Sequence, residues 1–131
     1  MFLDASAFCA MLMQEEEAEL FSLKLREAQR RITSPMAVWE TVVSVSKGLD
    51  IDLETARFDI ERYLSEFKIK NIAIEPETTV LALDAFRRYG KGRHPAALNF
   101  GDCFAYACAK HHKVPLLHKG NDFALTDIES A

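Results

Sequence analysis

Four acidic residues lie far apart in the chain, yet each is placed so that its side chain is expected to reach a common point. They are Asp4, Glu40, Asp102 and Asp122. Asp4 ends the apolar segment Met1-Phe2-Leu3, and Asp122 follows the loop after a second apolar segment, residues 114–117. Carboxylates that meet in one pocket repel one another at neutral pH unless a cation neutralises them. The pattern therefore indicates a divalent-cation site and metal-dependent chemistry on phosphates.

Each of the four acids also has a plausible structural role. Asp4 and Asp102 suit helix N-caps, and Asp122 suits a turn. Glu40 suits a surface ion pair with a lysine. However, Asp4 and Glu40 stand among apolar residues, where an unpaired charge is costly. This cost favours a shared, cation-filled site over four separate structural roles.

The elements that must position these acids alternate between strands and helices. Apolar segments predict strands at residues 1–4, 31–33, 69–74 and 114–117. Helical periodicity predicts helices at about residues 6–12, 15–29, 34–48, 52–67, 78–89 and 102–112. Pro35 suits the first position of its helix, Gly90 suits a helix C-cap, and the acids from Glu15 onward suit a first turn.

This alternation predicts an α/β fold, with a mostly parallel central sheet covered by helices on both faces. In such sheets ligands bind beyond the carboxyl ends of the strands. Asp4 and Asp122 follow strands, whereas Glu40 and Asp102 lie in early turns of helices. All four acids are therefore expected to converge at one edge of the sheet.

Length and composition predict one soluble globular domain. The chain has 131 residues, of which 49% are hydrophobic and 27% charged, and a domain of this size needs no disulfide. The odd number of cysteines, Cys9, Cys103 and Cys108, indicates buried thiols in a reducing compartment. No basic leader and no apolar run of about 18 residues is present, so we expect a cytoplasmic protein without a membrane span.

The net charge of −4 does not exclude a nucleic-acid partner, because the charges are segregated along the chain. Lys91, Arg93 and His94 lie in a loop that contains Gly90 and Gly92. Cations on a flexible loop suit contact with phosphate, and a basic rim beside an acidic, metal-filled pocket is what a nuclease requires. The neighbouring Arg87 and Arg88 are equally compatible with the solvated face of a helix.

Several of these segments carry a family resemblance. Residues 1–7, 98–107 and 119–123, together with Glu40, resemble PIN-domain ribonucleases of the VapC toxin type. The resemblance spans nearly the whole chain, the motifs occur in the family's order, and the stretch from Tyr89 to Tyr106 is the most specific part. It implies a single PIN-like domain over residues 1–131, built as a three-layer sandwich.

The resemblance also implies an activity and its partners. It implies a Mg²⁺-dependent endoribonuclease, with Mn²⁺ able to substitute, that acts as the toxin of a type II toxin–antitoxin pair. Such a toxin is neutralised by a cognate VapB-type antitoxin and is usually a homodimer. The expected chemistry is in-line attack on phosphorus by water that the metal activates, with no covalent nucleophile on the protein.

Residue by residue, Asp4, Glu40, Asp102 and Asp122 take the places of the family's acidic quartet. We expect Asp4 and Asp102 to bind the metal directly, and Glu40 and Asp122 to orient water or to hold a second ion. Ser6 takes the place of a hydroxyl residue that supports the site. Thr126 and Asp127 are candidates for a further polar position. Lys91, Arg93 and His94 are expected to contact RNA.

Two other classes of protein fit part of the pattern. A phospho-acceptor receiver domain shares the length, the α/β class, an acidic Mg²⁺ pocket and a lysine after a late strand, here Lys119. It requires an Asp at the end of a middle strand, but residues 72–74 lead into Glu75, and it gives Asp102 no role. The other class is a non-catalytic interaction module built on the apolar helices around residues 38–45 and 58–67. Some of this apolar surface is expected to serve an antitoxin helix in any case.

Overall fold

The computed structural model describes residues 1–131 and contains one four-stranded sheet and six α-helices. The elements are β1 (Phe2–Leu3), α1 (Ala5–Leu12), α2 (Ala18–Glu27), β2 (Ile32–Thr33), α3 (Pro35–Leu49), α4 (Leu53–Glu66), β3 (Lys70–Asn71), α5 (Thr78–Tyr89), α6 (Phe100–His112), β4 (Leu116–Leu117) and the 3₁₀-helix η1 (Phe123–Leu125). All strand pairs are parallel, in the order β3-β2-β1-β4. The predicted α/β class and parallel sheet are confirmed. No helix is long and apolar enough to cross a bilayer.

The alternation of side chains along the short strands divides the interior into two cores. Phe2 and Leu116 enter one core, which α5 and α6 cover, whereas Leu3 and Leu117 enter a second core, which α1 and α2 cover. Successive residues of a strand point to opposite faces of the sheet, so two residues suffice to supply both cores. Helices therefore cover both faces, as the three-layer prediction requires.

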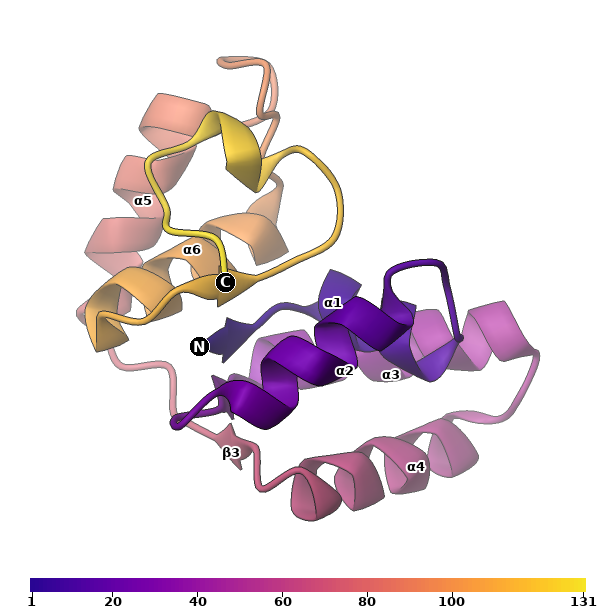
Figure 1. Ribbon diagram of the computed structural model, residues 1–131. Coiled ribbons are helices and arrows are strands. Elements are labelled where there is room, and N and C mark those ends of the chain that lie inside the picture. The colour runs from indigo at the N-terminus through magenta and orange to yellow at the C-terminus, as the bar shows by residue number, and fades with distance from the viewer.

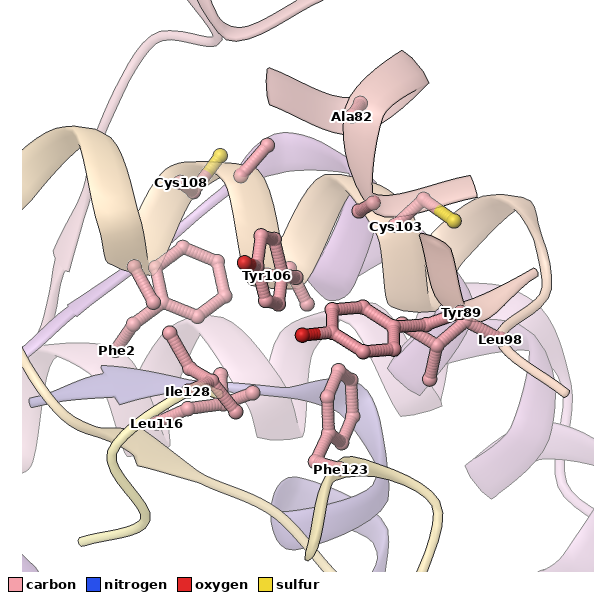
Figure 2. Close-up of a cluster of buried hydrophobic side chains, with 14 of the residues drawn as sticks. Phe2, Ala82, Tyr89, Leu98, Cys103, Tyr106, Cys108, Leu116, Phe123 and Ile128 are labelled. Carbon is pink, nitrogen blue, oxygen red and sulfur yellow. The ribbon is translucent and has the colours of Figure 1, made fainter. Parts of the chain in front are cut away.

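The first core is closed by the end of the chain. Figure 2 shows Phe2 and Leu116 converging with Tyr106 of α6, and Phe123 and Ile128 lie in the same cluster. In Figure 1 the yellow C-terminal segment runs alongside α6 and ends beside β4. The residues that follow β4 are thus part of the packed domain.

Side-chain caps determine where several helices begin. Ser34 accepts a hydrogen bond from the Ala37 N–H (3.2 Å) at the start of α3, where Pro35 occupies the first position as predicted. Asp52 similarly accepts from the Thr55 N–H (2.9 Å) at the start of α4. Each cap satisfies a backbone donor that the helix itself leaves unpaired.

The start of α2 differs from the prediction. The acids from Glu15 onward were expected in its first turn, but α2 begins at Ala18. Instead, Nζ of Lys119 lies 2.7 Å from Glu15 Oε2 and 3.0 Å from Glu17 Oε2. These ion pairs join the acidic segment before α2 to a lysine near the opposite end of the chain.

Candidate active site

Asp4 occupies the carboxyl end of the central strand β1 and is 95% buried, with a relative exposure of 5%. Its Oδ2 accepts hydrogen bonds from the Ser6 N–H (3.0 Å) and the Ser6 hydroxyl (2.5 Å), so it caps α1. The same Ser6 oxygen accepts from the Lys119 N–H (3.0 Å). Ser6 therefore ties the loop after β4 to the acid that follows β1. Both bonds to Asp4 use one oxygen, and Oδ1 has no hydrogen bond within the chain.

Glu40 reaches the same region from α3 because α6 carries a glycine opposite it. A methyl group on Gly101 would lie 2.1 Å from Glu40 Oε1 and 2.7 Å from Oε2. No side chain larger than hydrogen fits there without displacement of the carboxylate. The backbone of Gly101 is in an ordinary helical conformation, so the need for glycine is steric. The glutamate thus lies directly against the first turn of α6.

Asp102 lies in that same turn and is part of a reciprocal cap. Asn99 Oδ1 accepts from the Asp102 N–H (3.0 Å), and Asp102 Oδ2 accepts from the Asn99 N–H (2.8 Å). This capping box fixes the orientation of the Asp102 carboxylate and stabilises the helix N-terminus. The N-cap role anticipated for Asp102 belongs instead to Asn99, because α6 begins at Phe100 and Asp102 is its third residue. Asp102 still stabilises this helix end from within the pocket.

The three acids line one pocket of about 300 Å³. The residues that line it are Asp4, Ala5, Ser6, Cys9, Trp39, Glu40, Val43, Ser44, Asn99 and Asp102. None of the ion pairs in the chain includes Asp4, Glu40 or Asp102. The pocket consequently concentrates negative charge that no lysine or arginine of the chain neutralises.

Burial and mutual repulsion raise the pKa of two of these acids. Burial, followed by the charges of Asp4 and Asp102, raises the pKa of Glu40 to about 7. Burial raises the pKa of Asp102 to about 6; the backbone hydrogen bond from Asn99 opposes this rise, and the charges of Asp4 and Asp122 add to it. Without a cation, it is therefore unfavourable for both carboxylates to be ionised at the same time.

The fourth acid, Asp122, lies at the edge of the site. It precedes η1, is exposed and does not line the pocket, but it is near enough to Asp102 to influence its pKa. No three acidic, histidine or cysteine side chains lie close enough together to form a ready-made set of metal ligands. The pocket is thus an open carboxylate cluster in which water must complete any coordination shell.

Comparison with known proteins identifies the family. A family profile for the PIN domain matches residues 1–129. The chain belongs to the PIN-domain family. "Ribonuclease VapC" of Mycolicibacterium smegmatis is 37% identical over 128 residues, covering 98% of this chain and 97% of the relative.

Two solved structures share the fold of this PIN domain. VapC20 of Mycobacterium tuberculosis, described as a sarcin-ricin loop cleaving toxin, superposes with a TM-score of 0.76 at 11% identity and covers 99% of this chain and 97% of that one. A toxin–antitoxin complex from Klebsiella pneumoniae gives a TM-score of 0.69 at 18% identity, covering 94% and 89%. At these identities the likeness concerns the fold.

Membership of the PIN-domain family excludes the receiver-domain alternative. The contacts of Lys119 agree, because its ammonium group pairs with Glu15 and Glu17. A receiver lysine would instead face the acidic pocket. In addition, the strand predicted at residues 69–74 is confined to β3 (Lys70–Asn71), which ends before Glu75 and is the outermost strand of the sheet, next to β2.

Thr126 and Asp127, expected as a further polar position, make their contacts elsewhere in this PIN domain. The Thr126 hydroxyl donates to the Phe123 carbonyl (2.7 Å) and closes the turn after η1. Asp127 accepts from the Tyr106 hydroxyl (2.6 Å) and lies 3.2 Å from Arg88; the Tyr106 hydrogen bond is the main reason that its pKa is lowered to about 2. Neither lines the pocket, and both anchor the C-terminal segment.

The basic loop after α5 also lies outside the pocket lining. Lys91 and Arg93 are exposed, and the Arg93 guanidinium lies over the Phe86 ring at 5.2 Å from its centroid. His94 Nδ1 accepts from the Ala96 N–H (3.1 Å). The loop is therefore an ordered turn in which His94 has a structural contact, whereas Lys91 and Arg93 present charge to solvent.

Six residues that line the pocket were not among the candidate site residues of the sequence analysis: Ala5, Cys9, Trp39, Val43, Ser44 and Asn99. Two of them carried a usable signal. Ser44 follows Glu40 by one helical turn, so the two share a helix face, and Asn99 precedes Asp102 with capping-box spacing. Cys9 is free, and burial raises the pKa of its thiol to about 11. It is therefore an unreactive part of the wall.

The raised pKa of Glu40 predicts a pH-dependent stability. The folded-state pKa of about 7 lies above the ordinary value of 4.5, so the folded chain binds the proton more tightly, and the glutamate destabilises the fold as pH rises through this window. In chelator, Glu40→Gln should therefore equal the wild type near pH 4 and exceed it by about 1–2 kcal/mol at pH 8. Urea unfolding at both pH values measures this difference; parallel stability curves for the two proteins would contradict it.

The contact between Gly101 and Glu40 predicts that substitutions at these two positions change the free energy of unfolding in a non-additive way. Alanine in place of a helical glycine ordinarily adds up to about 1 kcal/mol of stability. Gly101→Ala should gain less than this in the wild-type background, because the new methyl group overlaps the Glu40 carboxylate and forces that side chain to move aside. In a Glu40→Ala background the overlap is gone, and the same change should stabilise the fold.

Urea unfolding of the two single variants and the double variant gives the coupling energy. Gly48→Ala is the matched control, because Gly48 is also helical but its added methyl group would meet Met13 Sδ at 2.6 Å and not Glu40, so its effect should be the same in both backgrounds. Equal effects of Gly101→Ala in both backgrounds would mean that Glu40 does not require the glycine.

Proposed function

We propose that this PIN domain is a divalent-cation-dependent endoribonuclease, the toxin of a toxin–antitoxin pair, and that it cleaves RNA at the pocket formed by Asp4, Glu40 and Asp102. The observation that carries this proposal is the convergence of three carboxylates without a cationic partner at the carboxyl end of a parallel sheet. The full-length similarity to a protein named Ribonuclease VapC supports the same activity.

The donor set fits Mg²⁺, with Mn²⁺ as a substitute. Carboxylate oxygens suit hard cations, and Mg²⁺ retains several waters and binds through one or two carboxylates plus substrate phosphate. An open cluster without three preassembled ligands agrees with a largely hydrated ion. We assign Asp4 and Asp102 as direct ligands. The cation, when bound, supplies charge neutralisation and an activated water.

The residues of the chain then have distinct tasks. Ser6 and Asn99 hold the carboxylates of Asp4 and Asp102 by the hydrogen bonds described above. Glu40 makes no hydrogen bond within the chain, and Gly101 allows it to lie against α6. This leaves its carboxylate oxygens available to orient water and to accept a proton during attack on the phosphate. Asp122 would add negative charge at the rim or help to hold a second ion.

The proposed partners other than RNA are proteins. An antitoxin of the VapB type follows from the VapC relatives, and a second copy of the chain would form a homodimer. Exposed apolar side chains are available for them. Leu83 and Phe86 of α5 and Phe100 of α6 line one hollow, and further exposed apolar residues are Val80 on α5, Leu20 and Leu23 on α2, and Leu53 and Phe58 on α4. A cytosolic location is proposed because the substrate and a reducing environment for free thiols are found there.

Metal dependence is the first test of this function. The purified chain should cleave total cellular RNA in Mg²⁺, lose the activity in EDTA and regain it in Mn²⁺. Asp4→Asn should abolish cleavage while leaving the free energy of unfolding unchanged or higher, since it removes a buried, unpaired charge. Mapping of RNA ends by sequencing measures the cleavage.

Asp50→Asn is a suitable control for Asp4→Asn. Asp50 is an exposed acid at the C-cap of α3, where asparagine tolerates the left-handed conformation equally well. Cleavage that persists in chelator would refute the metal mechanism. If Asp4→Asn retained full activity, the cleavage would have to arise at another site. The pocket would then fit the non-catalytic alternative.

The basic loop generates a separate prediction. Arg93→Ala should weaken RNA binding and reduce the slope of log affinity against log salt by about one phosphate contact. Arg62→Ala serves as the control, because Arg62 is exposed on α4 and pairs only with Asp59. Fluorescence anisotropy of labelled RNA over a salt series measures both variants. An unchanged slope for Arg93→Ala would remove this loop from the path of the substrate.

A further inference from the structure

The rim of the acidic pocket carries a large aromatic side chain that faces water. Trp39 is the single tryptophan of the chain, precedes Glu40 on α3 and is 65% exposed. It lines the same pocket as the three carboxylates. No aromatic or cationic side chain of the chain packs against its ring. An indole face left open beside a charged cavity is available to a ligand.

Helix α3 presents two adjacent rows of side chains to this pocket. Glu40 and Ser44 are four residues apart and form a polar row, and Trp39 and Val43 form the next, apolar row. All four line the cavity, and Val43 is 38% exposed. The cavity therefore combines anionic oxygens with a flat apolar shelf along its lip.

The other exposed aromatics of the chain are not in this position. Phe100 is 70% exposed but packs edge-on against Phe104, with ring centroids 5.1 Å apart. Phe86 lies under Arg93, and together with Phe100 it lines a separate, almost wholly apolar hollow between α5 and α6. Phe58 is on α4 and lines neither cavity. Among them, Trp39 alone adjoins the carboxylates.

We propose that Trp39, supported by Val43, stacks an unpaired nucleobase of the RNA substrate next to the phosphate that is cleaved. This inference rests on the proposed ribonuclease function and assigns it a base-binding subsite. A nucleotide joins an anionic phosphate to a flat apolar ring. Asp4 and Asp102 would hold the cation that attracts the phosphate, and the indole face of Trp39 matches the ring. An apolar protein segment would also pack against Trp39 and Val43, but it would leave the adjacent row of Glu40 and Ser44 without a binding partner.

The chemistry of stacking defines the class of substrate. A base within a duplex is covered on both faces by its neighbours, so only an unpaired base can lie on the indole. Every base has a π-face, and stacking on an aromatic side chain therefore tolerates different sequences. The subsite selects single-stranded or looped RNA and discriminates weakly among the four bases.

The single tryptophan makes the contact directly observable. A short single-stranded RNA, mixed with the wild-type chain in Mg²⁺, should change the tryptophan fluorescence in a saturable way, recorded by stopped flow before cleavage proceeds. An oligonucleotide with the same sugar–phosphate backbone but no bases carries the same charge and should leave the fluorescence unchanged. Equal responses to both oligonucleotides, or to neither while the RNA is cleaved, would overturn the proposal.

Variants separate stacking from charge. Trp39→Ala should raise KM for single-stranded RNA by roughly 5- to 150-fold, with kcat changed far less and the salt slope of binding unchanged. Trp39→Phe retains an aromatic face and should recover most of the loss. Phe58→Ala is the matched control, because Phe58 is 63% exposed outside the pocket.

The outcomes distinguish this subsite from the activity on which it rests. Cleavage by the wild type with an unchanged KM for Trp39→Ala overturns the stacking proposal and leaves the nuclease intact. An unchanged KM together with weakened binding of a purified antitoxin would mean that the shelf binds protein instead. Absence of cation-dependent cleavage by the wild-type chain would overturn both the function and the subsite.

Discussion

Electrostatic repulsion among Asp4, Glu40 and Asp102 is the constraint on which the functional edge of this domain depends. Parallel strands bring their carboxyl ends to the same edge of the sheet, and the three acids lie at that edge. Lys119, whose backbone lies beside this site, does not neutralise it. Its backbone N–H reaches Ser6 beside Asp4, whereas its ammonium group is held by Glu15 and Glu17. The pocket therefore keeps a charge that an external cation must balance.

The same side chains that create this repulsion also stabilise the elements that carry them. Asp4 caps α1, and Asp102 completes the capping box of α6. Each aspartate uses one carboxylate oxygen to accept hydrogen bonds at the start of its helix. The position of the carboxylate is therefore fixed before any ligand binds. Gly101 contributes by the absence of a side chain, which allows α3 and α6 to approach with Glu40 between them. Structural and chemical roles coincide in these residues.

The parts of the fold that were predictable are those with local causes. The cap at Asp4, the position of Pro35 at the start of α3, and the alternation of strands and helices predicted the parallel sheet and the edge at which the acids meet. Contacts between distant segments were not predictable. The acids before α2 pair with Lys119, and Asp127 pairs with Tyr106 and Arg88, all of them far away in the sequence.

The exposure of Trp39 was not predictable from the sequence for a related reason. Residue type alone suggests that it belongs to the buried face of α3. That face consists instead of the smaller residues Ala37, Thr41 and Val45, one helical turn apart. Trp39 is two residues from both Ala37 and Thr41, so it lies on the opposite side of the helix and faces outward. Which stripe of an apolar helix is buried depends on its neighbours, and one sequence without its tertiary contacts does not specify it.

The brevity of β1 has a consequence for how the domain gains and loses its activity. Phe2 and Leu3 are both completely buried, in different cores, and the next residue is Asp4. Melting of either core would release this dipeptide and move the acid that follows it. The two halves are thereby joined into a single cooperative folding unit. A partly unfolded chain retains no competent site, so a cellular protease that traps the opened form would end the activity in one step.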